Sequence, residues 1–325
     1  MEMTKRPVVV ATRHFPDAVE ERLQALFEAR LNPDDRPLPP EELLSRAQGA
    51  DGLLVAATGR VDADLIGRLP PSVRIIATFS VGYEHIDVAA AERRGILVTN
   101  TPDVLTDATA EIALLLLLAA ARRAHEGAAM LRQGQWSGWT PTQLMGIGLT
   151  GKRLGIVGMG RIGQALAQRA RACGMEIHYY NRTRLAPAQE QGAVYYPTVE
   201  ALLPQAQFLS LHCPLTPQTA KLMDARRLAM LPPGAVLVNT ARGGIVDDEA
   251  AIAALNSGRL AAAGLDVFDG EPNVDKRYFG IENAFILPHM GSATIETRNA
   301  MGFRAIENLK AVLIDGQEPP HRVRA

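Results

Sequence analysis

Residues 153–163 read Arg153-Leu-Gly-Ile-Val157-Gly158-Met-Gly160-Arg-Ile-Gly163, and this stretch is the strongest indication of the fold. A strand-like run, Arg153–Val157, comes directly before a G-x-G-x-x-G pattern, and a helical pattern over Ile162–Cys173 follows it. In a strand–turn–helix unit, the three glycines allow a tight turn, the approach of a pyrophosphate and close packing of helix on strand. The amino end of the helix then faces the anion. The stretch therefore predicts a dinucleotide-binding βαβ unit.

The same alternation of strands and helices continues downstream. Crossover helices such as Asp248–Ser257 fit between most of the strands, which is typical of a doubly wound dinucleotide-binding sheet. With Arg153–Val157, the expected strands are Glu176–Tyr180, Phe208–His212, Ala235–Asn239, Ala262–Val267 and Ala284–Leu287.

A second alternating region precedes the glycine-rich stretch. Its expected strands are Pro7–Ala11, Gly52–Ala56, Arg74–Phe79 and Ile96–Val98, and its expected helices are Asp17–Arg30, Pro40–Ala47 and Asp87–Arg93. A long apolar helix over Thr106–Arg123, a loop over Gly134–Gly148 and a last helix over Ser292–Ile314 complete the chain. We expect an α/β protein with two Rossmann-like domains. The dinucleotide-binding domain, 104–290, is inserted into a flavodoxin-like substrate-binding domain, 1–103 and 291–325.

Composition narrows the class of protein and its partners. The chain has 325 residues, 47% of them hydrophobic and 21% charged, with a net charge of −1. No block of like charge predicts a nucleic-acid or membrane partner. The apolar run Ile112–Ala121 has about half the length of a membrane span, and no signal peptide precedes it, so we expect a cytoplasmic protein. Cys173 and Cys213 do not have the spacing of a metal site, and no metal is expected.

The segment after the second strand bears on cofactor choice. An acid is expected there to bind the ribose 2′-hydroxyl of NAD, but this chain has Asn181-Arg182-Thr183-Arg184. Asn181 would not repel a 2′-phosphate and could still hydrogen-bond the ribose, and Arg182 could pair with the phosphate. NADP(H) is therefore the expected cofactor, with NAD(H) as the alternative.

Three chemically distinct side chains follow three of the expected strands. Arg242, Glu271 and His289 each come shortly after a strand end. Because ligands of open α/β sheets bind outside the carboxyl ends of the strands, we expect these side chains to converge. A cation, a general acid and a carboxylate that keeps the acid protonated are what hydride transfer to a 2-oxo acid requires. By contrast, His14, His178 and His321 are expected to be surface residues.

Several long motifs carry a resemblance over essentially the whole chain. They are the glycine-rich turn, Leu211-His-Cys-Pro-Leu-Thr-Pro-Gln-Thr219, Asn239-Thr-Ala-Arg-Gly-Gly244 and Pro288-His-Met-Gly-Ser-Ala-Thr294. The chain resembles the D-isomer-specific 2-hydroxyacid dehydrogenase family, and within it the glyoxylate/hydroxypyruvate reductases. The resemblance implies NAD(P)H-dependent reduction of a small 2-oxo acid, and a homodimer.

The resemblance also implies residue roles. His289 would be the proton donor, Glu271 its paired carboxylate and Arg242 the substrate-binding cation. In the loop Ser80–Tyr83, the amides of Val81 and Gly82 would hold the substrate carboxylate, and Trp139 would reach into the partner subunit's pocket. The predicted cofactor-binding residues are Thr109, Gly158, Gly160, Arg161, Ile162, Gly163, Asn181, Arg182, Thr183, Cys213, Pro214, Thr219, Thr240, Ala241, Asp266 and Gly291.

Three alternatives stay open at this point. Within the enzymes, a 2-ketogluconate reductase or another D-2-hydroxyacid dehydrogenase would have the same motifs. A phosphoglycerate dehydrogenase often carries a C-terminal regulatory domain, and this chain ends soon after His289. Outside the enzymes, a nucleotide-sensing corepressor could use the same fold as a binding module.

Overall fold

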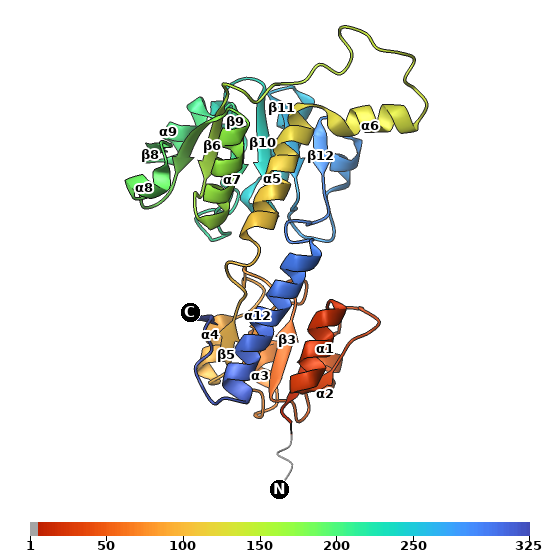
Figure 1. Cartoon of the computed structure of the whole chain (residues 1–325), viewed down its shortest axis with the longest axis vertical. Helices are drawn as coiled ribbons and strands as arrows, with labels where there is room; N and C mark the ends of the chain where they lie inside the picture. The colour runs from red at the N-terminus through yellow and green to blue at the C-terminus, as the bar shows by residue number, and fades with distance from the viewer. Residues whose placement is uncertain (1–5) are drawn as a thin grey trace. The chain divides into compact units, whose positions relative to one another are not determined.

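A computed structural model describes residues 6–325, and the chain forms two compact units. One unit runs up to Leu105 and resumes at Ala293–Ala325, and the other is Thr106–Ser292. Each unit has one largely parallel sheet with helices on both faces (Figure 1). The expected α/β class with two Rossmann-like sheets is thereby confirmed.

The discontinuous unit has a six-stranded sheet in the order β13-β5-β4-β3-β1-β2. Its parallel part, β2-β1-β3-β4-β5, is the flavodoxin-like order, and only β13 is antiparallel. The strands are β1 (Val8–Ala11), β2 (Glu28–Arg30), β3 (Gly52–Val55), β4 (Ile75–Thr78), β5 (Leu97–Thr99) and β13 (Arg322–Val323). The helices are α1 (Asp17–Leu26), α2 (Pro40–Arg46), α3 (Ala63–Arg68), α4 (Val88–Arg93) and α12 (Ile295–Leu313).

Alternate residues of each strand in this unit enter different cores. Val8 and Val10 face the core that α2, α3 and α4 cover, whereas Val9 faces the core of α1 and α12. Strands β1 and β3 are apolar throughout because both faces of a parallel sheet are covered. At one point α1 and α12 touch so closely that a Cβ at Gly302 would lie 2.3 Å from Val19 Cγ2.

The inserted unit has a seven-stranded sheet in the order β12-β11-β10-β9-β6-β7-β8. The run from β8 to β11 is the doubly wound order, which changes direction at β6, and β12 extends it. The strands are β6 (Arg153–Val157), β7 (Glu176–Tyr180), β8 (Val194–Tyr196), β9 (Phe208–Leu211), β10 (Ala235–Asn239), β11 (Leu260–Leu265) and β12 (Ala284–Ile286). The helices are α5 (Thr106–Ala121), α6 (Ala124–Arg132), α7 (Arg161–Ala172), α8 (Pro187–Glu190), α9 (Val199–Leu202), α10 (Ala225–Met230) and α11 (Asp248–Asn256), with short 3₁₀ turns η1 (Leu203–Gln205), η2 (Gly243–Ile245) and η3 (Lys276–Gly280).

Helix α5 packs across the middle of this sheet beside α7 (Figure 1). A Cβ at Gly264 of β11 would lie 2.7 Å from Leu116 Cβ, so glycine lets this helix approach the strand. The apolar length of α5 is therefore explained by burial inside the unit. Among residues 6–325, no helix is both long and apolar enough to cross a membrane.

The sequence predictions failed at short elements and at one helix end. The predicted helix Asp17–Arg30 stops at Leu26, and Glu28–Arg30 forms the edge strand β2. Strands β8 and β13 and helices α3 and α6 were missed. Strands of two or three residues at a sheet edge leave too little hydrophobic pattern to be recognised. The predicted six strands of the inserted unit are consequently seven.

Candidate active site

The glycine-rich turn after β6 has the geometry that its sequence predicts. Gly158 has φ +93°, and a Cβ there would lie 2.6 Å from the amide nitrogen of Cys213. A Cβ at Gly163 would lie 2.7 Å from the carbonyl oxygen of Gly158, so close packing of α7 on the turn requires glycine. In contrast, no atom lies within 4 Å of a Cβ built at Gly160, which begins α7. This side of the turn is open to a ligand.

Side chains from neighbouring strands complete a site suited to a dinucleotide. Thr240, after β10, is buried, and its hydroxyl has no hydrogen-bond partner among the described residues. Cys213, after β9, is a neutral thiol because burial raises its pKa to about 11. Thr219 accepts a hydrogen bond from the Thr216 amide (2.7 Å) and donates one to the Pro214 carbonyl (2.6 Å). The open turn and the unpartnered Thr240 hydroxyl fit a nicotinamide dinucleotide.

The two arginines in the segment after β7, Arg182 and Arg184, have different surroundings. Arg184 pairs with the buried Glu190 carboxylate through Nε (2.7 Å) and Nη2 (3.1 Å), and its guanidinium lies over the Tyr195 ring. Arg182 is exposed, and no partner for it is found among residues 6–325. Asn181 hydrogen-bonds the backbone of Met159 inside the glycine-rich turn. Arg182 is thus the cation of this segment that a ligand can reach.

His289 and Glu271 form the pair that the sequence suggested. The Nδ1 atom of His289 lies 2.7 Å from Glu271 Oε2, and the other carboxylate oxygen accepts a hydrogen bond from the Phe268 amide at 2.7 Å. Burial opposes ionisation of Glu271, but the hydrogen bonds from His289 and Phe268 outweigh it and lower the pKa of this carboxyl. Because Nδ1 is taken by Glu271, Nε2 is the imidazole atom left to face a ligand.

Asp266 holds the turn on which His289 lies. Its backbone carbonyl accepts a hydrogen bond from the His289 amide (2.8 Å), and its two carboxylate oxygens accept from the amides of Met290 (2.6 Å) and Gly291 (2.8 Å). Thr109 of α5 donates to the Gly291 carbonyl at 3.0 Å. Burial raises the pKa of Asp266, and the two amide hydrogen bonds oppose this rise. Asp266 and Thr109 therefore support His289, whose φ is +54°.

Arg242 lies on a loop that Asn239 shapes. The Asn239 side chain, only 1% exposed, accepts from the Ala241 amide (3.0 Å) and donates to the Arg242 carbonyl (2.9 Å). The next residue, Gly243, lies against Phe268, where a Cβ would be 1.8 Å from the carbonyl carbon. The loops that carry Arg242 and Glu271 are therefore in direct contact. The role of Asn239 was missed, although a polar residue closing an otherwise apolar strand was a signal for it.

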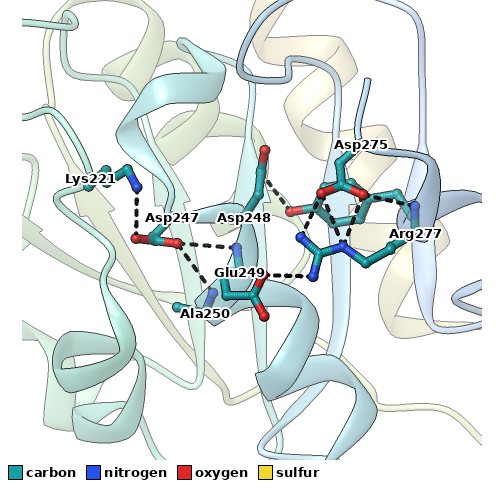
Figure 2. A network of polar contacts seen from close by, with 8 residues as sticks. Lys221, Asp247, Asp248, Glu249, Ala250, Asp275 and Arg277 are labelled. Atoms are coloured by element: carbon teal, nitrogen blue, oxygen red, sulfur yellow. Dashed lines mark hydrogen bonds and ion pairs between the residues drawn. The ribbon is translucent and has the colours of Figure 1, made fainter. Parts of the chain in front are cut away.

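A polar network supports the segment between β11 and β12 that carries Glu271. Arg277 pairs with Asp275 and with Glu249 of α11, both at 2.7 Å (Figure 2). Tyr278 donates to Asp248 of the same helix at 2.8 Å. Asp247 caps α11 and pairs with Lys221 at 3.2 Å (Figure 2). The start of α11 thus anchors this segment close to Glu271 in the chain.

The predicted carboxylate-binding loop lies in the other unit. Asn100 donates to the Val81 carbonyl (2.8 Å), and the Ser80 hydroxyl donates to the Gly82 carbonyl (2.6 Å). Thr78 contacts both Ser80 (2.8 Å) and His85 (3.0 Å). Both carbonyls are thus engaged by side chains, while neither amide of Val81 and Gly82 is hydrogen-bonded within the described residues. Sequence reasoning missed the supporting role of Asn100.

Two further residues named in the sequence analysis differ in exposure. Trp139 is 79% exposed and lies on the extended loop after α6. His178 was expected on the surface, but it is buried and stacks on Tyr196, whose hydroxyl lies 3.0 Å from its Nδ1. That expectation was wrong because the missed strand β8 covers β7 at this edge of the sheet.

Comparison with known proteins gives one consistent result. Residues 114–291 match the family described as D-isomer specific 2-hydroxyacid dehydrogenase, NAD binding domain. A glyoxylate reductase of Thermococcus litoralis is 44% identical over 98% of this chain and 97% of its own length. A glycerate dehydrogenase of Hyphomicrobium methylovorum is 41% identical over 95% of this chain and 97% of its own length.

A solved structure of similar fold adds a ligand-bound example. It is an NADPH-dependent glyoxylate/hydroxypyruvate reductase from Sinorhizobium meliloti in complex with NADP and malonate. It superposes with a TM-score of 0.88 at 37% identity and covers 98% of this chain and 97% of its own. The matched family region contains the glycine-rich turn, Arg242, Glu271 and His289. The chain belongs to the D-isomer specific 2-hydroxyacid dehydrogenase family, and the part that matches is its NAD-binding domain.

Proposed function

We propose that this protein reduces small 2-oxo acids, glyoxylate and hydroxypyruvate first among them, to 2-hydroxy acids with NADPH. The observation that carries the proposal is the 2.7 Å contact between His289 Nδ1 and Glu271, in the same unit as an open glycine-rich turn. A positioned proton donor next to a dinucleotide site is what carbonyl reduction needs. The names of the glyoxylate reductase and glycerate dehydrogenase relatives support this substrate class.

Each residue has a distinct part in this reaction. A bound nicotinamide dinucleotide, held at the glycine-rich turn, would supply the hydride for the C2 carbonyl carbon. His289 donates the Nε2 proton to the oxygen of that carbonyl, while Glu271 stabilises the imidazolium and fixes its orientation. Arg242 pairs with the substrate and polarises its carbonyl. The amides of Val81 and Gly82 bind the substrate carboxylate, which makes the discontinuous unit the substrate-binding domain.

The substrate proposal is tested by one panel of initial rates. Glyoxylate, hydroxypyruvate and 2-ketogluconate are each supplied with NADPH and with NADH, and D-glycerate is tested in the reverse direction with NADP⁺ and NAD⁺. We expect the highest kcat/KM for glyoxylate or hydroxypyruvate with NADPH. A preference for 2-ketogluconate would overturn the substrate proposal. Binding of cofactor without turnover of any acid would favour the corepressor-like alternative.

The preference for NADPH rests on Arg182. No acid follows β7 to repel a 2′-phosphate, and Arg184 is engaged by Glu190, so Arg182 is the available cation. A charge-assisted hydrogen bond contributes about 1.5–3 kcal/mol, or roughly 10- to 150-fold in selectivity. Arg182→Ile should remove most of this preference, whereas Arg22→Ile, which removes an exposed charge from α1, should not. Equal use of NADH by the wild type would contradict the proposal.

The proposed assembly is a homodimer formed by the inserted unit. Helix α6 has no buried residue, and the loop after it exposes Trp136 (52%), Trp139 (79%) and Met145 (66%). Leu115 and Leu118 of α5 add further exposed apolar surface. Large exposed apolar side chains of this kind are typical of an interface between subunits. We propose a second copy of this chain as its partner, with Trp139 reaching the partner subunit's pocket.

A further inference from the structure

The Asn181 side chain binds both backbone groups of one residue in the phosphate-binding turn. Its Oδ1 accepts a hydrogen bond from the Met159 amide at 2.6 Å, and its Nδ2 donates to the Met159 carbonyl at 3.3 Å. Met159 is the residue between the first two glycines of the turn, and its side chain is 1% exposed. The carboxamide therefore connects the end of β7 to the centre of the turn.

Asn181 is one of two side chains among the described residues that hydrogen-bond the backbone of Met159. Gly158 and Gly160, on either side of Met159, have no side chains to fix their backbone. Besides Asn181, Gln164 donates to the Met159 carbonyl at 3.3 Å, and Gly160 donates to the Gly158 carbonyl at 2.8 Å. Glycine has the greatest conformational freedom in the unfolded or unliganded chain, so an external contact is needed to hold one conformation.

A carboxamide has the right groups for this contact, and its close relatives do not. Asparagine offers an acceptor and a donor side by side, which match the amide and the carbonyl of one residue. An aspartate could accept from the Met159 amide, but its second oxygen would face the Met159 carbonyl oxygen. Alanine would leave both groups of Met159 without this partner.

We propose that Asn181 is a positioning residue that holds the phosphate-binding turn in its binding conformation. It then sets the affinity for NADPH and NADH alike, and it does not set the preference for one over the other. The inference rests on the proposed function, in which this turn binds the cofactor. Selectivity then belongs to Arg182, the next residue in the chain. Asn181 thereby has a different role from the acid that binds the ribose in many dinucleotide-binding domains.

The neighbouring contacts separate these two roles in space. The Glu190 carboxylate accepts from the Tyr179 hydroxyl (2.6 Å) and from Arg184, and the Leu185 amide donates to the Tyr179 hydroxyl (3.1 Å). The segment after Asn181 is therefore held at both ends, by Met159 and by Glu190. Arg182 lies between these anchors and is exposed.

The test measures the Kd of NADPH and of NADH for wild type and Asn181→Ala by fluorescence titration. We expect both Kd values to rise by about tenfold, the equivalent of about 1.4 kcal/mol, and their ratio to stay within about twofold of wild type. The KM for each cofactor should rise in the same proportion and by more than kcat falls, because the proposed role of the turn is to bind the pyrophosphate. A residue that only stabilises the fold would lower Tm without this selective effect on cofactor affinity.

Asn283→Ala is the matched control. The Asn283 carboxamide also makes two contacts with backbone, donating to the carbonyls of Leu255 (3.3 Å) and Ala261 (3.2 Å), but it lies at the amino-terminal end of β12. Parallel strands place that end on the edge of the sheet opposite the turn. This variant should therefore lose stability without any change in either Kd.

Asn181→Asp is the second variant. Its expected effect on NADH binding depends on whether residue 181 binds Met159 or the ribose of the cofactor. If Asn181 acts through Met159, the aspartate should weaken NADH binding, since its second oxygen repels the Met159 carbonyl. If residue 181 instead binds the ribose, the aspartate should strengthen NADH binding, and the proposal would be overturned. A change of more than about tenfold in the NADPH-to-NADH ratio for Asn181→Ala, or no change in either Kd, would overturn it as well.

Failure of the proposed function gives a different result. If the wild type binds neither cofactor, the function is wrong and the turn has no dinucleotide to hold, so both proposals fall. If the wild type binds NADH more tightly than NADPH, only the cofactor preference falls. The ratio between variant and wild type still decides the role of Asn181 in that case.

Discussion

For single residues, the proposed reaction would depend on how the imidazole of His289 is held. Glu271 takes Nδ1 of His289, and Asp266 fixes the backbone around His289 through three hydrogen bonds. One carboxylate is thus oriented toward the imidazole, and the other toward the amides of the turn. The first fixes the orientation of the His289 ring, and the second fixes the backbone of the turn that carries it.

His289→Gln should remove the proton donor while leaving the turn intact. We expect kcat to fall by about 10²–10⁴, the usual contribution of a positioned general acid, with little change in the Kd of the cofactor. His14→Gln is a matched control, because His14 also lies 3.0 Å from a glutamate, Glu20, on the surface of the other unit. Turnover by His289→Gln within tenfold of wild type would show that another group donates the proton.

Arg242→Lys should be a damaging change although it keeps the positive charge. Lysine lacks the planar two-pronged guanidinium that can bind a carboxylate or carbonyl in a fixed geometry. We expect kcat/KM for the 2-oxo acid to fall sharply while the Kd of the cofactor stays near that of wild type. Near-normal kinetics in steady-state assays would show that Arg242 does not bind the substrate in this way.

Glu271→Gln should change the pH dependence of stability. The pKa of Glu271 is lowered in the folded state, so its contribution to stability is present above its unfolded pKa and is lost as pH falls through the folded value. The difference in unfolding free energy between wild type and variant should therefore be largest near neutral pH. It should become smaller as the pH falls into the acidic range. Superimposable profiles of unfolding free energy against pH for wild type and Glu271→Gln would contradict the pairing of Glu271 with His289.

At the scale of elements, the active-site loops depend on each other. The loop after β10 carries Arg242, and the segment after β11 carries Glu271. Arg277 (Figure 2) and Tyr278 anchor that segment to α11. Gly243 is the point where the two loops meet, since only a residue without a side chain fits against Phe268. Displacing either loop should therefore move both Arg242 and Glu271.

Gly243→Ala tests this dependence. The new methyl group would meet backbone atoms that cannot rotate away, and such overpacking typically costs about 1–3 kcal/mol or more. We expect a loss of unfolding free energy in urea together with a fall in kcat. Gly244→Ala is the control, because its Cβ would meet only side-chain atoms of Leu215 and Asp269, at 3.3 Å or more. Equal behaviour of the two variants would show that the contact with Phe268 is not critical.

At the scale of the whole molecule, the exposed apolar surface of the inserted unit predicts a dimer. Light scattering at micromolar concentration should give twice the mass of one 35.0 kDa chain. Leu118→Glu, which places a charge on exposed α5 surface, should shift the mass toward one chain. Phe303→Glu on α12 is the control, since Phe303 is 39% exposed and Leu118 is 38% exposed. A wild-type mass of one chain would contradict the homodimer.

The sequence alone predicted the features of this protein that depend on local pattern. The strand, glycine turn and helix around Gly158, the long apolar helix α5 and the order of the alternating elements all follow from residues close together in the chain. Arg242, Glu271 and His289 could also be placed, because parallel strands bring their carboxyl ends to one edge of the sheet. The fold class and the family followed from these features.

Only the tertiary structure decided which side chains are partners. Asn181 is bonded to Met159 and Asp266 to the turn after His289, contacts over 22 and 24–25 residues of chain that no periodicity encodes. The edge strand β8, too short to recognise, buries His178 against Tyr196. Hydrogen bonds depend on distances of a few tenths of an ångström between atoms brought together by packing. Such distances are determined when the sheets and helices pack, whereas a sequence pattern specifies only the faces that they present.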